Sequence, residues 1–406
     1  MIEVDEALTL CLAEAGPLQM VRVPLEDALD NVLAEDVSSD VDSPPHDKSL
    51  VDGYAVVAND VGSGKVELEI LEEITAGDCP TKPVRPGTAT RIMTGAPIPA
   101  GADAVVMVEQ TKSGNESNDP PTVLIHVGSI VEGQHIMRRA TSLHDGQVVL
   151  SAGRVIRSAE IGLLAEVGQS NVPVIRRPTV SILATGNELV PASDRPGAGQ
   201  IRNSNSPMLS AAVRKTGGEP NDLGIGRDDE SELTHFVQKG LKSDVLLLSG
   251  GVSMGVLDLI PKVLSRSGVQ QVFHKVRLKP GKPLWFGVLP SEDGNRLVFG
   301  LPGNPVSGFV CFELFVRPVI LALAGHTRTQ PSRFSAQLSQ PHTHRGDRPT
   351  YWPAKLVREN GQGFVEPLDW RGSADLRTLA EANCLAFFPA GDRVRNVGDC
   401  VQVQSI

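Results

Sequence analysis

Residues 245–255 have the sequence VLLLSGGVSMG, and this stretch decides the fold class. Four consecutive large apolar residues predict a strand that is buried on both faces, as in parallel sheets covered by helices. The glycines that follow predict a tight loop at the carboxyl end of that strand. The order of apolar strand, glycine loop and helix occurs twice more, at 180–188 and from 297 to beyond 305. This repetition predicts a doubly wound, mixed or parallel sheet in a three-layer α/β/α domain.

Two helices are expected between these strands. The first is capped by Ser204 or Asn205 and ends at the glycine pair 217–218, which is a helix-stop signal. The second covers about 230–242. We therefore predict that 178–326 is one α/β/α domain with ligand sites at the carboxyl ends of its strands.

The sequence on either side of this domain has different patterns. The first 45 residues carry helical patterning, beginning with an amphipathic helix at Val4. With 141–177 they predict a discontinuous α+β N-terminal domain. Short β-type runs separated by glycines predict an inserted β-rich domain at 46–140. The stretch 327–406 alternates short β-runs with turns and predicts a small β-barrel or sandwich.

The composition of the 406 residues excludes several classes of protein. A net charge of −10 gives no basic surface for nucleic acid or an anionic membrane. We expect no apolar run near the roughly 20 residues that a membrane span needs, and the acidic N-terminus lacks the basic region of a secretory signal. Five scattered cysteines without a C-x-x-C pair argue against a disulfide framework or a zinc site. We therefore expect a cytoplasmic protein.

The loop after the central strand can bind an anion. Glycines at a strand-to-helix junction allow backbone N–H groups to converge on a phosphate, and the helix dipole adds positive potential. The candidate binding residues are Ser249, Gly250, Gly251 and Ser253. A tight turn without a ligand is the alternative. Asp258 favours binding, because a carboxylate beside an anion site is useful when a Mg²⁺ ion bridges the two.

Two further carboxylates follow neighbouring elements of the sheet. Glu188 lies in the first glycine loop and Asp228 lies in the sequence GRDD at 226–229. Together with Asp258 they predict a set that positions a divalent cation and water on one rim of the crevice. For each carboxylate alone, a helix cap or a turn former is the competing interpretation.

Cations are concentrated in residues 275–283, with the sequence KVRLKPGKP. The prolines, among them Pro283, fix the backbone, so Lys279 and Lys282 are held with little loss of chain entropy. This arrangement suits an oxyanion pocket, whereas a solvated charged face is the alternative. The turn at 300–305 is expected on the same rim, either as a binding or as a purely structural segment; its candidate residues are Pro302, Gly303 and Asn304.

Several motifs, in a fixed order over nearly the whole chain, resemble one family. Taken alone, Asp52 and Thr94 are turn residues without a readable mechanism. The motifs are DGYA at 52–55, MTGAP at 93–97, GADAVV at 101–106, TGNEL at 185–189, SGGVS at 249–253, KPGKP at 279–283 and GLPGNP at 300–305. Together they resemble the molybdenum insertase family, which includes bacterial MoeA and the E domain of gephyrin.

The resemblance implies a four-domain subunit ending in a β-barrel, a homodimer with composite active sites, and a molybdotransferase reaction. Molybdate joins the dithiolene of adenylated molybdopterin, and Mg²⁺-dependent hydrolysis of the pyrophosphate bond releases AMP. The pterin would come from an adenylyltransferase, and the product would pass to molybdoenzymes or their chaperones. The family's active-site positions correspond to Asp52, Thr94, Glu188, Asp228, Asp258, Lys275, Lys279, Lys282, Arg348 and Ser373.

The chain departs from the family pattern at residues 140–142, where Ala-Thr-Ser replaces Gly-Glu-Asp, and at residues 256–257 before Asp258. The resemblance assigns Glu188, Asp228 and Asp258 to Mg²⁺ and water. It assigns Lys279, Lys282, Arg348 and Ser373 to molybdate; tungstate has nearly the same size. Two rival functions stay open. One is a pterin adenylyltransferase, whose single-domain members lack the flanking domains, and the other is a gephyrin-like scaffold without catalysis.

Overall fold

In the computed structural model the buried apolar runs are the central strands of a six-stranded sheet. The strand order is β16-β13-β17-β20-β19-β18. The first four strands are parallel, and β19 and β18 are antiparallel to their neighbours. The bounds are β13 Thr179–Thr185, β16 Glu219–Gly226, β17 Val245–Ser249, β18 Gln270–His274, β19 Trp285–Leu289 and β20 Arg296–Leu301. The predicted doubly wound mixed sheet is thereby confirmed.

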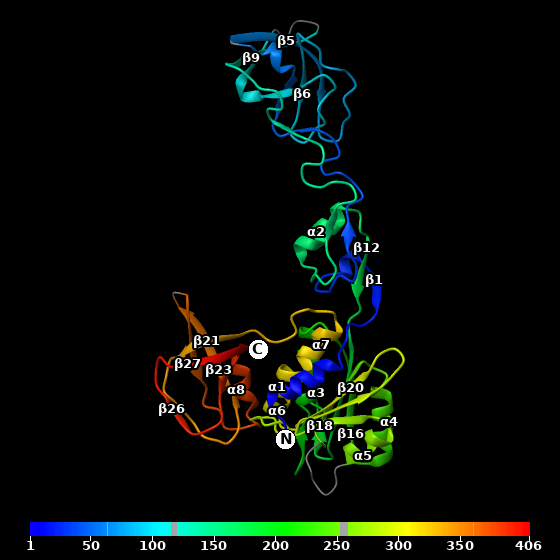
Figure 1. Ribbon diagram of the computed structural model, residues 1–406, viewed down its shortest axis with the longest axis vertical. Helices are drawn as coiled ribbons and strands as arrows, with labels where there is room; N and C mark the ends of the chain where they lie inside the picture. Colours follow the sequence, from blue (N-terminus) through cyan, green and yellow to red (C-terminus); the bar gives the residue numbers. More distant parts are fainter. Residues whose placement is uncertain (63, 115–119, 252–258, 360) are drawn as a thin grey trace. The chain divides into compact units, whose positions relative to one another are not determined.

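The chain forms two compact units, and we consider each by itself (Figure 1). The larger unit contains the sheet and consists of Met1–Glu35, Ala152–Ile161 and Asn171–Ile406. The smaller unit consists of Asp36–Ser151 and Gly162–Ser170. The structure describes residues 1–62, 64–114, 120–251, 259–359 and 361–406. The finer division into four domains stays a prediction.

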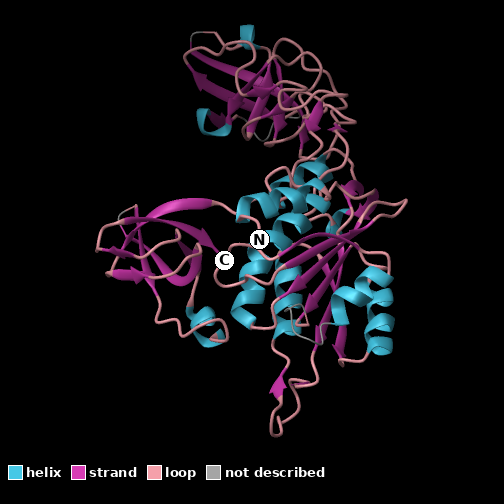
Figure 2. Ribbon diagram, turned by 60° about the horizontal axis from the view of Figure 1, so that its bottom comes forward, coloured by secondary structure: helices cyan, strands magenta, loops and turns pink. Residues whose placement is uncertain are grey.

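Helices cover both faces of the sheet, as Figure 2 shows. Alternate residues of β17 point to opposite faces: Val245 and Leu247 belong to one buried cluster, and Leu246 and Leu248 to the other. This alternation follows from the two-residue period of a strand and explains why the whole run is apolar. The first cluster contains α1 Val4–Ala13, α3 Asn205–Lys215, α6 Pro305–Cys311 and α7 Arg317–Leu323; the second contains α4 Glu230–Gly240 and α5 Leu259–Arg266.

The expectation that no apolar run approaches membrane-spanning length was wrong. The continuous helix Pro305–Leu323, which includes a π-helical turn at Phe312–Val316, has 19 residues and a mean hydropathy of 1.9. It is 78% buried within the protein. Phe312, Phe315 and Ile320 pack in the same cluster as the sheet. The helix is apolar on most sides because it is a core helix of the α/β/α layers.

Two expectations about local structure need correction. Beyond Ala13 the first 45 residues form no further α-helix and one 3₁₀ turn, Leu25–Asp27; β1 Met20–Pro24 instead pairs antiparallel with β12 Asn171–Ile175. A partner strand about 150 residues away decides this pairing, and helical periodicity cannot reveal it. The cap of α3 also differs from the expectation. Asn203 Oδ1, rather than a side chain of Ser204 or Asn205, accepts the N–H of Ser206 at 3.1 Å.

The smaller unit is built on a second sheet of order β7-β4-β6-β5-β9-β8. Strands β8 and β9, at one edge of this sheet, pair antiparallel. The strands are β4 Gly53–Val56, β5 Gly64–Ile74, β6 Thr88–Ile92, β7 Ala104–Met107, β8 Thr111–Ser113 and β9 Thr122–Val127. Short pairs join β2 Val37–Ser38 to β11 Val148–Leu150 and β3 Lys48–Ser49 to β10 Ile136–Met137. Helix α2 Ser158–Glu166 belongs to this unit only from Gly162 onward.

The C-terminal stretch forms a closed barrel, which decides between the barrel and the sandwich. Its order is β21-β24-β23-β25-β27. The bounds are β21 Arg333–Leu338, β23 Thr350–Glu359, β24 Gln362–Pro367, β25 Cys384–Phe388 and β27 Cys400–Ser405; β22 His342–His344 pairs with β26 Arg393–Arg395, and α8 covers Leu376–Glu381. Closure leaves the barrel strands without free edges.

Candidate functional site

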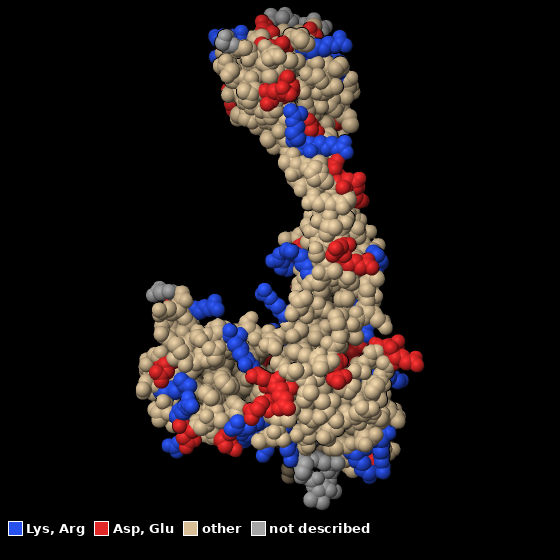
Figure 3. Space-filling model, viewed as in Figure 1, with Lys and Arg blue, Asp and Glu red and all other residues tan. Residues whose placement is uncertain are grey.

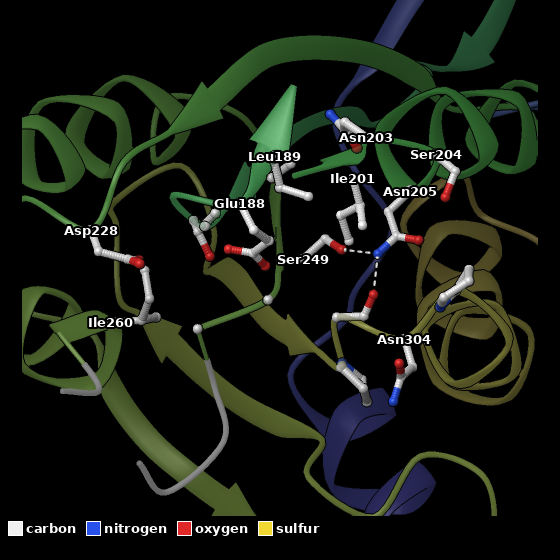
Figure 4. Close-up of a pocket in the computed structure, with 18 of the residues that line it drawn as sticks. Glu188, Leu189, Ile201, Asn203, Ser204, Asn205, Asp228, Ser249, Ile260 and Asn304 are labelled. Carbon is white, nitrogen blue, oxygen red and sulfur yellow. Dashed lines mark hydrogen bonds between the residues drawn. The ribbon is translucent and has the colours of Figure 1, made fainter. Parts of the chain in front are cut away.

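The strand order of the larger unit places a crevice at the carboxyl ends of β13 and β17. From β13 the chain moves to one side to form β16 and then to the other side to form β17. Connections that leave in opposite directions open a crevice between the two strands, where ligands bind in such sheets. A cavity of about 720 Å³ lies there (Figure 4).

This first cavity brings together many residues that the sequence singled out. They are Glu188, Asp228, Ser249, Gly250, Gly251, Pro283, Pro302, Gly303 and Asn304. Ser253 and Asp258 lie outside the described residues. The three glycine loops therefore meet at one crevice, as the parallel arrangement of their strands requires.

Two carboxylates line the cavity, and Arg202 lines it too without forming an ion pair with either. Glu188 follows β13 and Asp228 follows β16, and both project into the region shown in Figure 4. The N–H of Asp228 donates to Asn187 Oδ1 at 3.2 Å, which fixes the turn. Within the described residues neither carboxylate forms an ion pair, and no group of three metal-ligating side chains occurs. Two carboxylates without an ion-pair partner among the described residues supply some of the oxygen ligands that a hard divalent cation needs.

The glycine loop is tightly packed, and one of its N–H groups is already used. Gly250 has φ +99°, and a Cβ there would lie 2.6 Å from Thr185 O, so only glycine fits. Its N–H donates to Leu301 O at 3.1 Å. This N–H therefore joins the ends of β17 and β20, and anion binding by the rest of the loop stays a prediction.

Asn205 is a site residue that the sequence analysis treated only as a cap. Its Nδ2 donates to Ser249 Oγ at 2.8 Å and to Gly303 O at 2.7 Å (Figure 4). It thus ties two glycine loops together at the first cavity. No sequence signal identifies this role, because its partners are 44 and 98 residues away.

A second cavity, of about 490 Å³, adjoins the first and shares Pro283, Pro302 and Asn304 with it. Its described lining has four cationic side chains and no carboxylate. The cations are Lys279, Lys282, Arg348 and Arg371, and Ser373 also lines the cavity. On the face shown in Figure 3, basic and acidic side chains of the larger unit are interspersed. Arg348 lies 3.5 Å from Asp347 and Arg371 lies 3.5 Å from Asp369, so the positive charge without an ion pair among the described residues comes from the two lysines.

The barrel positions the lysine loop. The N–H of Lys279 donates to Pro349 O and its carbonyl accepts the N–H of Tyr351, both at 2.9 Å. Arg348 Nη1 donates to Leu278 O at 2.9 Å. The loop also needs glycine at 281, where φ is +121° and a Cβ would lie 2.6 Å from Cys311 Sγ. These contacts fix the backbone of the lysine loop against residues 348–351.

Ser373, the last of the residues predicted to bind the anion in this cavity, is held by a hydrogen bond from helix α6. The N–H of Val306 donates to Ser373 O at 3.0 Å, which places Ser373 at the start of the helix. Lys275 lines neither cavity, so its role stays a prediction.

The aromatic residues Trp352 and Trp370 also line the second cavity. The sequence analysis missed both tryptophans, because their sequence context has no motif that marks a ligand site, and it assigned no role to Arg371 beside Ser373.

Asp52 and Thr94 lie together in the smaller unit. Asp52 Oδ1 accepts hydrogen bonds from the N–H and the hydroxyl of Thr94, each at 2.7 Å. These two bonds lower the pKa of the Asp52 carboxyl from its ordinary value. Both residues are exposed, because they lie at ends of the neighbouring strands β4 and β6. They form a pre-organised polar pair on the surface of that unit.

Comparison with known protein families gives three consecutive matches. The MoeA N-terminal region (domain I and II) matches residues 2–168. A probable molybdopterin binding domain matches 181–322. The MoeA C-terminal region (domain IV) matches 335–406. Together the matches cover nearly all of the chain, including both cavities.

Full-length relatives agree with these matches. Proteins named molybdopterin molybdenumtransferase are 34% identical in Staphylococcus aureus, over 99% of this chain and 95% of the relative, and in Synechococcus elongatus, over 100% of both. A crystal structure of the molybdopterin biosynthesis MoeA protein from Pyrococcus horikoshii is 29% identical, with a TM-score of 0.80 over 100% of both chains. The chain therefore belongs to the MoeA family of molybdopterin molybdenumtransferases, which are transferases of molybdenum cofactor biosynthesis.

Proposed function

We propose that the protein inserts molybdate into the dithiolene of adenylated molybdopterin, with Mg²⁺-dependent hydrolysis of the pyrophosphate bond and release of AMP. One observation carries this proposal: two adjoining cavities share a wall, and one is lined by two carboxylates and one arginine while the other is lined by four cations and no carboxylate. A substrate with a phosphoanhydride at one end and a metal-binding dithiolene at the other needs two such environments side by side.

The cationic cavity would hold the molybdate. Lys279, Lys282 and Arg348 offer charged donors, and Ser373 adds a hydroxyl. Charge-assisted hydrogen bonds to an oxyanion are about twice as strong as neutral ones. The guanidinium of Arg348 is already oriented by Leu278 O, so little side-chain freedom is lost on binding. This donor set suits any tetrahedral oxyanion of the appropriate size, including tungstate.

The carboxylate-lined cavity would hold the phosphoanhydride. Glu188 and Asp228 fit a Mg²⁺ ion because they face one cavity and neither forms an ion pair with a described residue, and we assign Asp258 to the same set. Such an ion, when bound, offsets negative charge on the phosphates. A carboxylate that does not touch the ion can accept a hydrogen bond from water and orient it toward the phosphorus. Asn205 holds the two glycine loops together through its hydrogen bonds to Ser249 and Gly303.

A homodimer with composite sites would complete the active centre. Asp52 and Thr94 belong to the smaller unit, and Glu188 and Asp228 belong to the larger unit. In a two-fold dimer each residue pair can serve the partner's crevice, which gives two equivalent sites. We also propose a cytoplasmic location, receipt of the pterin from an adenylyltransferase, and delivery of the product to molybdoenzymes or their chaperones.

The two rival functions are less well supported. Single-domain adenylyltransferases lack the flanking regions that match here at 2–168 and 335–406. A scaffold without catalysis would not need four cations around one cavity. The deciding experiment incubates the protein with adenylated molybdopterin, molybdate and Mg²⁺, and follows AMP release together with cofactor formation. An adenylyltransferase would instead consume ATP and unmodified molybdopterin, and a scaffold would turn over neither.

A further inference from the structure

Arg277 belongs to the cationic run 275–283, but it lines neither the first nor the second cavity. Its guanidinium instead contacts two other segments of the larger unit. Nη2 donates to Asp347 O at 2.8 Å, and Nη1 lies 3.2 Å from Glu3 Oε1. Arg277 therefore connects the lysine loop to the N-terminal segment and to the residue that precedes Arg348.

Residues 277–279 and 347–351 are joined by hydrogen bonds that run in both directions. Arg277 donates to a carbonyl of the second segment at 2.8 Å, and Arg348 donates to a carbonyl of the first at 2.9 Å. Two backbone bonds, both of 2.9 Å, join Lys279 to the second segment. Each segment thus places one arginine on the backbone of the other.

The spacing of these two segments determines how the charged donors of the second cavity are placed. Lys279 lines the cavity from one segment, and Arg348 lines it from the other. The segments are 70 residues apart in the sequence, so noncovalent bonds fix their distance. A small oxyanion can bond to donors on both segments only when that distance is kept, and donors already in place lose less freedom on binding.

We propose that Arg277 is a positioning residue of the oxyanion cavity: it fixes the backbone before Arg348 and so holds that guanidinium at its distance from Lys279. The inference rests on the proposed function and deepens it, because it adds a residue that acts on the oxyanion without touching it. Arginine suits this role, since its planar fork donates to Glu3 and to Asp347 at the same time, whereas an ammonium is a point charge. The ion pair with Glu3 is exposed and screened, so we assign the positioning chiefly to the bond with Asp347 O.

The first test measures molybdate binding to full-length Arg277→Ala by isothermal titration calorimetry. We expect the affinity to fall roughly threefold to tenfold, because the two segments would have the binding spacing only part of the time. In turnover assays the molybdate concentration for half-maximal rate should rise by the same factor, while kcat and the half-saturating concentration of adenylated molybdopterin should not change. Arg277→Lys should recover part of the affinity, since an ammonium can still donate to one of the two acceptors. Wild-type molybdate affinity in Arg277→Ala would overturn the inference.

Arg177→Ala is the matched control. Arg177 also donates to one side chain and one carbonyl, Asn31 Oδ1 at 2.8 Å and Leu29 O at 3.0 Å, and it lines neither cavity. Both variants lose bonds of the same kind, so we expect similar losses of stability, but only Arg277→Ala should bind molybdate more weakly. Equal weakening in the two variants would show a general effect on the fold and would contradict a positioning role.

A double-mutant cycle tests whether Arg277 acts through Arg348. Arg277→Ala should weaken molybdate binding in the wild-type background and have little further effect in the Arg348→Gln background, because the two substitutions would remove the same interaction. An equal loss of affinity in both backgrounds would show that the two residues act independently, and the inference would be wrong.

Lys279→Ala separates failure of this inference from failure of the proposed function. If Lys279→Ala weakens molybdate binding while Arg277→Ala does not, the inference is wrong and the proposed oxyanion cavity stands. If neither substitution weakens binding, the proposed oxyanion cavity is wrong as well. Weaker binding by both variants, with the Arg177→Ala control unchanged, supports both statements.

Hydrogen exchange measured by NMR tests the positioning without any ligand. The N–H groups of Lys279 and Tyr351 bridge the two segments, because they donate to Pro349 O and to Lys279 O. Both should exchange faster in Arg277→Ala than in the wild type, whereas Arg177→Ala should leave them unchanged. Wild-type protection of both N–H groups in Arg277→Ala would refute the claim that Arg277 holds the segments together.

Discussion

Mixed dimers provide the sharpest test of the composite active site. Asp52→Ala and Glu188→Ala change exposed residues of different units. Substitutions at exposed positions outside the core usually cost little stability, so both subunits should fold. Asp52→Ala removes the acceptor that holds Thr94 at 2.7 Å, and Glu188→Ala removes one of the two described carboxylates of the first cavity. Each homodimer should therefore be inactive or nearly so.

The expected recovery follows from two-fold symmetry. The two variants are unfolded together, refolded and allowed to pair at random, so that about half of the dimers are mixed. In a mixed dimer one site carries both substitutions and the other carries neither. About a quarter of wild-type activity should therefore return. The assay follows AMP release from adenylated molybdopterin in the presence of molybdate and Mg²⁺, normalised to total protein.

The structure supplies a matched control for this experiment. Asp52 and Thr94 share a hydrogen-bonded pair in one unit, so mixing Asp52→Ala with Thr94→Ala places a substitution in every site. This mixture should show no activity beyond that of its two parent homodimers. If verified heterodimers of Asp52→Ala and Glu188→Ala also gained nothing, both residues would serve a site within one chain. The composite-site proposal would then be wrong.

Three further predictions concern the metal, the oxyanion and stability. Excess chelator should abolish AMP release and added Mg²⁺ should restore it; Asp258→Asn should slow turnover at an unchanged melting temperature, and full activity in chelator would refute the metal assignment. Lys279→Ala and Lys282→Ala should each raise the molybdate concentration for half-maximal rate, since each loses a charged hydrogen bond worth about 1.5–3 kcal/mol; unchanged molybdate dependence would move the oxyanion site elsewhere. Asp244 is 2% exposed and accepts two bonds from Arg176, at 2.6 and 2.7 Å, so Asp244→Ala should lower the free energy of unfolding by about 3 kcal/mol in denaturant titrations. Burial raises the pKa of the Asp244 carboxyl, but hydrogen bonds from Arg176 and Thr179 lower it more, so its pKa lies below the ordinary value. The ionised carboxylate should therefore contribute its full share of the free energy of unfolding above about pH 4, and this contribution should be lost as the pH falls further. The Asp244→Ala variant should lack this pH-dependent loss.

The sequence by itself determined the elements whose signals are local. The apolar run at 245–248 predicted a strand buried on both faces, and β17 contributes alternate residues to two buried clusters. The glycine loops predicted a crevice at the carboxyl ends of the strands, and three of them line one cavity. These predictions succeeded because burial on both faces and tight turns restrict which residues can occupy a position.

Only the tertiary structure decided contacts between residues far apart in the chain. Arg348 reaches Leu278 across 70 residues, and Asn205 joins Ser249 to Gly303. Packing of the indole of Trp370 against that of Trp352, 18 residues away, likewise has no counterpart in the sequence, because only the folded chain brings the two rings together. The same reason explains the error in the first 45 residues. Periodicity reports which face of a segment is apolar, whereas the identity of its partner, here β12 for β1, is settled by packing of the whole unit.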